Sequence, residues 1–383
     1  MIGIRADANS IIATGHMMRC LTIAREIVRQ GESVTFFMAD DESDKLLTRF
    51  SGEDDFGRVV LGSDYRDMEG ELGLLEKELK ARNIKVLLVD SYSVTVGYFG
   101  RLSKICKVAY IDDLAREAYP VDLLINYSGY SENMGYEKLY DSSKTENEHK
   151  TRLLLGLKYA PLREQFYRSS INVQGNSYRE NTDWGKQSVD IMLATGGGDM
   201  CSMITNVLDK AEAEGLVFCR NKSGNDNISY TESYGNVTWH VVVGDFVENP
   251  KEIDNYGEKY GNVFLHKSVK DMAHLMRNCD IAVLAAGTML TECAACGLPA
   301  IFYQVADNQK YNVEYFGNLE GMIFAGAVHT GSMDKKAATN RIFENLKRLI
   351  DNKSVVKSMG ESLLEITDGR GAVRIAGALM DEI

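Results

Sequence analysis

Short apolar runs that end in Asp, Asn or Gly alternate along the whole chain with longer stretches of helical length and periodicity. This alternation is typical of parallel sheets, because a parallel strand needs a crossover, usually a helix, before the next strand begins. The candidate strands of the first half are residues 2–5, 34–38, 86–89, 108–111 and 123–126. Those of the second half are residues 191–194, 239–243, 263–265, 281–284 and 300–303. The sequence therefore predicts an α/β chain with two doubly wound parallel sheets.

The length of 383 residues exceeds the usual span of one hydrophobic core, which favours two domains. Residues 174–187 are polar, lack apolar periodicity and are the expected linker between domains at 1–173 and 188–383. The last helix is expected to pack back on the first domain. A second polar stretch, 221–236, is expected to be a surface excursion. Two such domains facing each other would hold a ligand in their cleft, outside the carboxyl ends of the strands.

The charge balance excludes several partners. The chain has 43 Lys and Arg against 55 Asp and Glu, a formal charge of −12, which argues against nucleic acid and anionic membranes. The N-terminus lacks the features of a secretory signal, and no apolar run has membrane-spanning length, so we expect a soluble cytoplasmic protein without membrane insertion. Seven scattered cysteines indicate reduced thiols; Cys293 and Cys296 form a C-x-x-C without a second pair at zinc spacing. We expect neither a metal nor a cofactor.

The first candidate loop connects the strand at 2–5 to an amphipathic helix that begins near Gly15 and His16. Unpaired N–H groups and the helix dipole favour an anion there, and an imidazole at this place can act as general base or acid. Thr14 capping the helix while His16 merely packs is an equally good interpretation. The apolar positions of the helix are Met17, Cys20, Leu21, Ala24, Ile27 and Val28, and Gly31 is its expected end.

Two further loops follow strands of the second half. In 195–199, three glycines would let the backbone approach a ligand closely, although the loop is neither G-x-G-x-x-G nor a P-loop, and a flexible turn also explains it. In the other loop, Gly287 and Thr288 could hold phosphate oxygens, and Glu292, one helical turn later, could accept two ribose hydroxyl protons. The alternative is a capping threonine with a first-turn glutamate.

Polar residues also follow other strands. Asp90 and Tyr92 lie at the end of one strand and Asp112 and Asp113 at the end of another, where carboxylates often only cap the next helix. The polar loop around Asn308 would open toward the same cleft as the glycine loops.

These motifs resemble one family in order and spacing. They are Arg5-Ala6-Asp7, the run 14–21, Asp90-Ser91-Tyr92, Ile111-Asp112-Asp113, the runs 124–127 and 156–163 with Phe166, and the two glycine loops. The family is the UDP-2,4-diacetamido-2,4,6-trideoxy-β-L-altropyranose hydrolases of pseudaminic acid biosynthesis, with spore-coat polysaccharide relatives. The glycine loops are shared with the wider group that includes the lipid-intermediate N-acetylglucosaminyltransferase of peptidoglycan synthesis. The chain departs from the family at residues 11–13 and in lacking a histidine at position 91.

The resemblance implies a GT-B fold and a UDP-sugar as the bound partner. It also implies a catalytic His16, with UDP held mainly by the second domain. It places Asp90, Tyr92 and Asn308 near the sugar or diphosphate, and we also expect Arg5, Asp7, Gly15 and Arg19 to bind the substrate. It places Gly197, Gly287, Thr288 and Glu292 near UDP, and we also expect Gly196 and Thr291 to bind UDP. Our hypothesis is inverting hydrolysis at the anomeric carbon, with His16 as general base; a UDP-sugar glycosyltransferase and a non-catalytic UDP-sugar binding protein are the alternatives. The sequence leaves the oligomeric state open.

Overall fold

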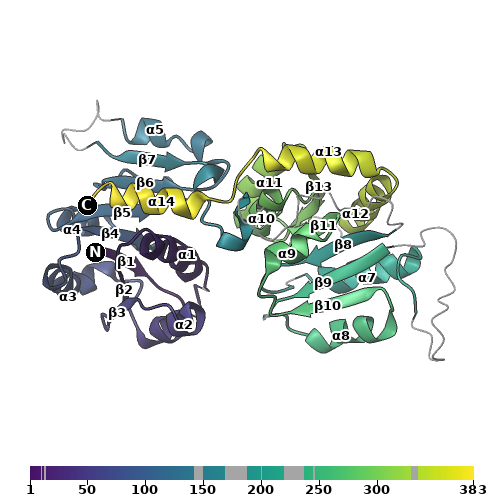
Figure 1. Cartoon of the computed structure of the whole chain (residues 1–383), viewed down its shortest axis with the longest axis horizontal. Helices are drawn as coiled ribbons and strands as arrows, with labels where there is room; N and C mark the ends of the chain where they lie inside the picture. The colour runs from purple at the N-terminus through teal and green to yellow at the C-terminus, as the bar shows by residue number, and fades with distance from the viewer. Residues whose placement is uncertain are drawn as a thin grey trace. The chain divides into compact units, whose positions relative to one another are not determined.

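A computed structural model describes residues 1–9, 11–12, 14–141, 150–168, 188–199, 201–219, 237–244, 246–328 and 335–383. The chain forms two compact units (Figure 1), one comprising Met1–Arg163 with Gly369–Ile383 and the other Glu164–Asp368. The second unit begins at Glu164, before the boundary expected at residue 173, and the C-terminal helix belongs to the first unit, the unit on which it was expected to pack. The expected linker 174–187 and the polar stretch 221–236 lie outside the described residues.

The first unit contains a seven-stranded parallel sheet in the order β3-β2-β1-β4-β5-β6-β7. Its strands are β1 (Ile2–Ala6), β2 (Val34–Met38), β3 (Gly57–Val60), β4 (Val86–Asp90), β5 (Lys107–Ile111), β6 (Leu123–Asn126) and β7 (Arg152–Leu155). The five predicted strands are confirmed. The two unpredicted strands, β3 and β7, lie at the edges of the sheet, where partly exposed residues replace the continuous apolar run that marks an interior strand.

Helices cover both faces of this sheet (Figure 1). They are α1 (Gly15–Arg29), α2 (Asp41–Ser51), α3 (Met68–Ala81), α4 (Val96–Leu102), α5 (Tyr136–Leu139) and α14 (Gly371–Met380), with 3₁₀ turns η1 (Ser131–Asn133) and η3 (Leu157–Tyr159). α14 packs against α1. The predicted apolar positions of α1 are buried except Val28, which is 45% exposed, because it falls at the margin of the apolar stripe.

The second unit contains a six-stranded parallel sheet in the order β10-β9-β8-β11-β12-β13. Its strands are β8 (Val189–Ala194), β9 (Val237–Val243), β10 (Val263–Lys267), β11 (Ile281–Ala285), β12 (Ala300–Gln304) and β13 (Met322–Ala327). Its helices are α7 (Met203–Ala213), α8 (Pro250–Lys259), α9 (Met272–Arg277), α10 (Met289–Cys296), α11 (Lys310–Phe316), α12 (Lys335–Ile350) and α13 (Lys353–Leu364), with turns η4 (Glu164–Phe166) and η5 (Asp307–Gln309). The sequence did not predict β13, an edge strand whose register shifts beside Tyr303.

In both sheets the strand order reverses beside the first strand of the unit, between β1 and β4 and between β8 and β11. Such a switch point opens a crevice at the carboxyl ends of the strands, because the helices that follow the two strands lie on opposite faces. Ala6 pairs with Asp90 across the first switch point, and Ala194 pairs with Leu284 across the second. This topology places His16 beside Asp90, and it starts the two glycine loops from the ends of neighbouring strands.

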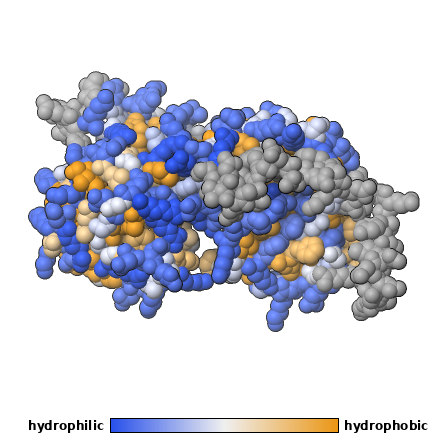
Figure 2. Space-filling view, in the orientation of Figure 1, coloured by the Kyte–Doolittle hydropathy of each residue, from blue (hydrophilic) through white to orange (hydrophobic). Residues whose placement is uncertain are grey.

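The surface in Figure 2 is largely hydrophilic, with separate hydrophobic patches on each unit. Within the described residues, no helix combines the length and the apolar character needed to cross a bilayer. All seven cysteines are free, and Cys293 and Cys296 are buried in α10, as the helical interpretation of their motif predicts.

A buried ion cluster lies under the end of β1. Arg5 is 0% exposed and its guanidinium contacts Asp7 Oδ2 at 2.5 Å and both carboxylate oxygens of Glu71 at 2.7 Å. The Tyr98 hydroxyl donates to the same Glu71 carboxylate at 2.9 Å. Burial alone lowers the pKa of Arg5, but the two carboxylates outweigh it and hold that pKa above its ordinary value. Arg5 is therefore a buried residue that neutralises two carboxylates. Because its side chain has no exposed surface, the structure does not support the expectation that it binds the sugar.

The substitution Glu71→Ala would leave the Arg5 guanidinium buried with only half of its compensating charge. We expect the free energy of unfolding to fall by about 3–5 kcal/mol, the usual cost of removing one partner of a buried ion pair. Urea denaturation followed by circular dichroism measures this change. The matched control is Glu78→Ala on the same helix, whose pair with Arg82 is partly exposed and should contribute less than about 1 kcal/mol. Equal losses in the two variants would contradict the assignment.

Candidate active site

The loop between β1 and α1 is shaped by side chains that bond to nearby backbone. Asn9 Oδ1 accepts hydrogen bonds from the N–H groups of Ile11 and Ile12 at 2.9 and 3.0 Å. The Ser43 hydroxyl bonds to both the N–H and the carbonyl of Ala8. Among the described residues, the Thr14 side chain caps none of the N–H groups of α1. The helix thus begins at an exposed Gly15 with its first N–H groups free of a side-chain cap, as an anion site would require.

His16 lies in the first turn of α1 and bonds to Asp90 at the end of β4. The distance between His16 Nδ1 and Asp90 Oδ1 is 2.6 Å, and both residues are buried, at 8% and 1% exposed. Because an ionised carboxylate only accepts, this contact assigns the imidazole proton to Nδ1. The other ring nitrogen, Nε2, then carries a lone pair that can accept a proton. These surroundings therefore do not favour the alternative in which His16 only packs in the core.

Asp90 is the centre of a larger network. Arg19, one turn after His16, donates to both oxygens of Asp90 at 2.5 Å, and Cys20 Sγ lies 3.5 Å from Oδ2. Burial by itself raises the pKa of Asp90, but Arg19 and His16 overcome burial and hold that pKa well below its usual range. Asp90 therefore stays ionised at any pH at which an imidazole titrates.

Tyr92 follows β4 and flanks the imidazole. Its ring lies edge-on to the His16 ring with centroids 4.8 Å apart, and its hydroxyl donates to Asp113 Oδ2 at 2.8 Å. Burial, followed by the charge of Asp113, raises the pKa of Tyr92. The side chain remains 49% exposed, so its ring is available to a ligand while its hydroxyl is held.

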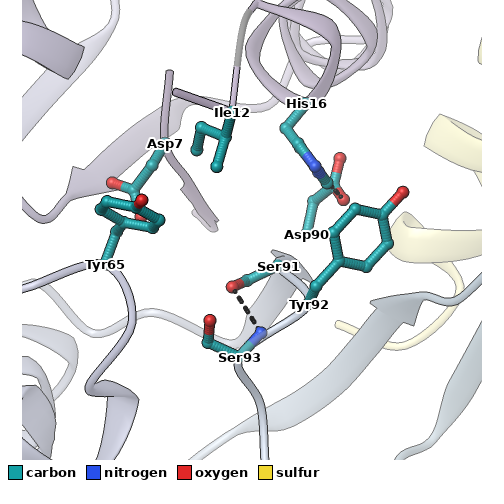
Figure 3. A pocket seen from close by; sticks show the side chains of 8 residues that line it. All are labelled: Asp7, Ile12, His16, Tyr65, Asp90, Ser91, Tyr92 and Ser93. Atoms are coloured by element: carbon teal, nitrogen blue, oxygen red, sulfur yellow. Dashed lines mark hydrogen bonds and ion pairs between the residues drawn. The ribbon is translucent and has the colours of Figure 1, made fainter. Parts of the chain in front are cut away.

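A pocket opens beside the imidazole (Figure 3). It offers about 290 Å³ of space, part of it open to solvent, and is lined by Asp7, Ile12, His16, Tyr65, Asp90, Ser91, Tyr92 and Ser93. Asp7 and Tyr65 face His16, Asp90 and Tyr92 across the pocket, and Ser91 and Ser93 form its floor in this view.

The pocket lining thus brings together His16, the expected general base, and three of the expected substrate-binding residues, namely Asp7, Asp90 and Tyr92. Arg5 and Arg19 do not line the pocket, because their guanidinium groups are bound to carboxylates. Tyr65 and Ser93 were not singled out by sequence reasoning. Both lie in loops after strands, but nothing in the local pattern distinguishes them from other loop residues.

The first glycine loop of the second unit packs tightly against the loop after β9. Gly196 adopts a positive φ of 86°, and a Cβ on Gly244 would lie 2.4 Å from the carbonyl oxygens of Gly196 and Gly197. The Phe246 N–H donates to the Gly197 carbonyl at 2.9 Å. Asp199 accepts from the N–H groups at the start of α7, at 2.7 and 3.0 Å. Loop-to-loop packing therefore explains part of the glycine content, and the backbone is held in a fixed turn.

The second glycine loop starts α10. A Cβ on Gly287 would meet no atom within 4 Å, so open space lies beside it. Thr288 is the exposed N-cap residue, and within the described part of the chain its side chain makes no capping hydrogen bond. Thr291 and Glu292 follow in the first turn and are half-buried. Asn308 is exposed in η5, after β12. These residues lie at the carboxyl edge of the second sheet, as expected.

The run 156–163 has a structural role in the first unit. A Cβ on Gly371 would lie 2.1 Å from the Ala160 carbonyl oxygen, so only glycine permits α14 to approach this closely. The Arg374 guanidinium also donates to the Lys158 carbonyl at 2.9 Å. This motif therefore docks the C-terminal helix and contributes no residue to the pocket lining.

No protein-family model matches the chain. It is 21% identical over 380 residues to the spore coat polysaccharide biosynthesis protein SpsG of Bacillus subtilis, a match that covers 99% of this chain and 98% of that protein. It is 22% identical over 383 residues to the uncharacterized protein MJ1062 of Methanocaldococcus jannaschii, which covers 95% of this chain and 71% of that protein.

The solved structures that resemble the whole chain include the following two. MurG of Acinetobacter baumannii superposes with a TM-score of 0.63 at 11% identity, covering 99% of each chain. UDP-GlcNAc 2-epimerase from Neisseria meningitidis, bound to UDP-GlcNAc, superposes with a TM-score of 0.61 at 12% identity, covering 100% of each chain. Identities this low show the fold alone. The chain therefore has the GT-B fold that its sequence motifs imply, and it is a distant homologue of SpsG and MJ1062.

Proposed function

We propose that this protein hydrolyses a UDP-linked diacetamido-trideoxy sugar to the free sugar and UDP. The observation that carries the proposal is the buried His16–Asp90 pair at the wall of the pocket. Distant homology to a polysaccharide biosynthesis protein supports the same class of substrate, as does a fold shared with an epimerase whose structure holds UDP-GlcNAc. The choice of hydrolysis, and of this sugar, rests on the motif resemblance.

In the proposed mechanism, His16 Nε2 takes a proton from a water molecule while the water oxygen attacks the anomeric carbon. The bond between that carbon and the β-phosphate oxygen breaks, its electron pair leaves with UDP, and the configuration inverts. Asp90 holds the imidazole proton on Nδ1 and stabilises the imidazolium that forms, which later releases its proton to solvent.

The second unit would supply the UDP site. Its glycine loops and the N-terminus of α10 offer backbone N–H groups to the diphosphate, and Glu292 offers a carboxylate to the ribose hydroxyls. A placed general base contributes typically ~10²–10⁴-fold, so much of the remaining acceleration must come from stabilising the charge that develops on the departing diphosphate. Fixed backbone dipoles suit that task because they need no reorganisation during the reaction.

The first test is turnover of a panel of UDP-sugars in ¹⁸O-labelled water, with and without candidate acceptors. We expect the label on the C1 hydroxyl of the released sugar, because water attacks carbon, and mass spectrometry measures it. Label on UDP would show attack at phosphorus and contradict the mechanism. Product that forms only with an added acceptor would identify a glycosyltransferase, and binding without turnover of any sugar would identify a binding protein.

Replacing the general base should separate catalysis from binding. We expect His16→Asn to lower kcat by about 10²–10⁴-fold while the Kd for UDP stays within about twofold, because His16 acts on water. Steady-state kinetics and calorimetry measure the two quantities. The matched control is His274→Asn, which makes the same chemical change at an exposed histidine of the second unit and should leave both unchanged. A His16→Asn enzyme with normal kcat would exclude the proposed base.

In catalysis, the Asp90 carboxylate should act through the imidazole. In Asp90→Asn, the amide can donate to Nδ1, which favours the tautomer with its proton on Nε2 and removes the base. We therefore expect kcat to fall by about 10²–10⁴-fold, a loss of the size seen when the triad aspartate of a serine protease is replaced by asparagine. A combined His16→Asn and Asp90→Asn variant should lose no more than His16→Asn alone. Additive losses would mean that Asp90 acts independently of His16.

A further inference from the structure

Tyr65 and Ser93 line the pocket, but the proposed mechanism gives neither of them a role (Figure 3). Tyr65 lies in the loop after β3, where the Arg66 guanidinium is 5.6 Å from the centre of its ring. Ser93 lies in the loop after β4, where its backbone N–H donates to Ser91 Oγ at 3.2 Å. In the described part of the chain, the hydroxyl groups of Tyr65 and Ser93 make no hydrogen bond, and both residues are partly exposed. Both hydroxyl groups are therefore available to a ligand.

The polar groups on the His16 side of the pocket are engaged within the protein. The Tyr92 hydroxyl donates to a carboxylate at 2.8 Å, so the part of Tyr92 that a ligand can contact is its ring. His16 Nδ1 bonds to Asp90, and both oxygens of that carboxylate accept hydrogen bonds. These groups serve to hold the imidazole, whereas the hydroxyl groups of Tyr65 and Ser93 hold nothing within the described chain.

Asp7 adds an acceptor on the wall that Tyr65 shares with it (Figure 3). Asp7 Oδ1 accepts the Ala39 N–H at 2.7 Å, and Oδ2 contacts Arg5 Nη1 at 2.5 Å. A carboxylate offers about four positions for hydrogen-bond donors, so Asp7 can accept a further one from a ligand. Because Arg5 already compensates its charge, Asp7 needs no cation from the ligand.

The charge of the lining favours a neutral group in the pocket. Among the described residues that line it, Asp7 and Asp90 are carboxylates and none is a lysine or an arginine. A diphosphate placed here would meet two carboxylates and no cation, which is a repulsive arrangement. The pocket therefore suits the sugar part of a nucleotide sugar, and the diphosphate belongs elsewhere.

We propose that Tyr65, Ser93 and Asp7 bind an amide substituent of the sugar and select substrates that carry one. An acetamido group has a carbonyl acceptor, an N–H donor and a methyl group at separate positions. The two hydroxyl groups match the carbonyl, the Asp7 carboxylate matches the N–H, and Ile12, which lines the same pocket, matches the methyl group. A sugar hydroxyl is a single oxygen and would leave part of this set unpaired, which a binding site penalises. The inference rests on the proposed function for the identity of the sugar.

The test compares three substrates with the full chain. They are UDP-2,4-diacetamido-2,4,6-trideoxy-β-L-altropyranose and its two analogues in which the acetamido group at C2 or at C4 is replaced by a hydroxyl group. In Tyr65→Phe and in Ser93→Ala, we expect kcat/KM for the diacetamido substrate to fall by about 2–12-fold, the usual net effect of losing one neutral hydrogen bond. The same variants should lose nothing with the analogue that lacks the bound acetamido group. Steady-state kinetics measures all three substrates.

The matched control is Tyr159→Phe, which removes the same oxygen from another partly exposed tyrosine of the first unit. Lys158 lies over the Tyr159 ring as Arg66 lies over Tyr65, but Tyr159 does not line the pocket. This variant should match the wild type with every substrate. Asp7 is left unchanged in the test because it also neutralises Arg5.

The pattern across substrates decides between a contact and a structural effect. Each test variant removes one oxygen atom from a partly exposed residue, so we expect both to fold, and thermal unfolding followed by circular dichroism checks this. Equal losses with all three substrates would assign the effect to the fold or to a shared part of the substrate and overturn the proposal. Unchanged kcat/KM with the diacetamido substrate in both variants would overturn it as well.

A binding experiment separates this proposal from the proposed function. If no UDP-sugar is hydrolysed, the proposed function fails, and calorimetry with UDP-GlcNAc and UDP-glucose tests the amide site alone. These two probes differ by an acetamido group against a hydroxyl group at C2. We then expect the wild type to bind UDP-GlcNAc more tightly, and Tyr65→Phe to reduce that preference by about 2–12-fold. Equal Kd values of the two probes for the wild type would overturn the amide site too.

Discussion

The site of the first unit depends on one buried carboxylate. Asp90 is 1% exposed and would be costly to ionise at that depth without compensation. Its oxygens instead accept hydrogen bonds from His16 Nδ1 and from two nitrogens of Arg19, and these donors compensate its negative charge. The same contacts fix the imidazole tautomer and bring α1 against the end of β4. Stability and chemistry are therefore coupled here, since the groups that compensate Asp90 are those that prepare His16.

The sheet topology explains why these groups meet. His16 follows the first strand of its unit and Asp90 ends the fourth, and the two strands are neighbours because the order reverses between them. The second unit repeats the arrangement with glycine loops after β8 and β11. In each unit the loops that carry the candidate site residues follow the two strands between which the strand order reverses. This switch point is the general location of ligand sites in open α/β sheets. The fold alone does not determine a reaction, so the functional assignment depends on the side chains.

The sequence predicted where the loops lie, but it did not predict the partners of individual charged side chains. The strands inside each sheet were predicted because they are buried on both faces and appear as continuous apolar runs. Edge strands such as β3 and β13 lack that signal. Arg5 and Arg19 were both expected at the substrate, yet one neutralises a buried Glu71 and the other Asp90. An arginine near the end of a strand or near the start of a helix has the same local pattern whether its partner is a ligand or a carboxylate 66 or 71 residues away.

The sequence by itself determined the alternation of strands and helices, the start of α1 at Gly15 and the position of the glycine loops, because these depend on local periodicity and backbone freedom. Only the tertiary structure decided which groups share a charge balance. The pairing of His16 with Asp90, the burial of Arg5 and the role of run 156–163 in docking α14 all join residues far apart in the chain. Electrostatic energy depends on distance and burial in three dimensions, and neither is encoded in the spacing of residues along one segment.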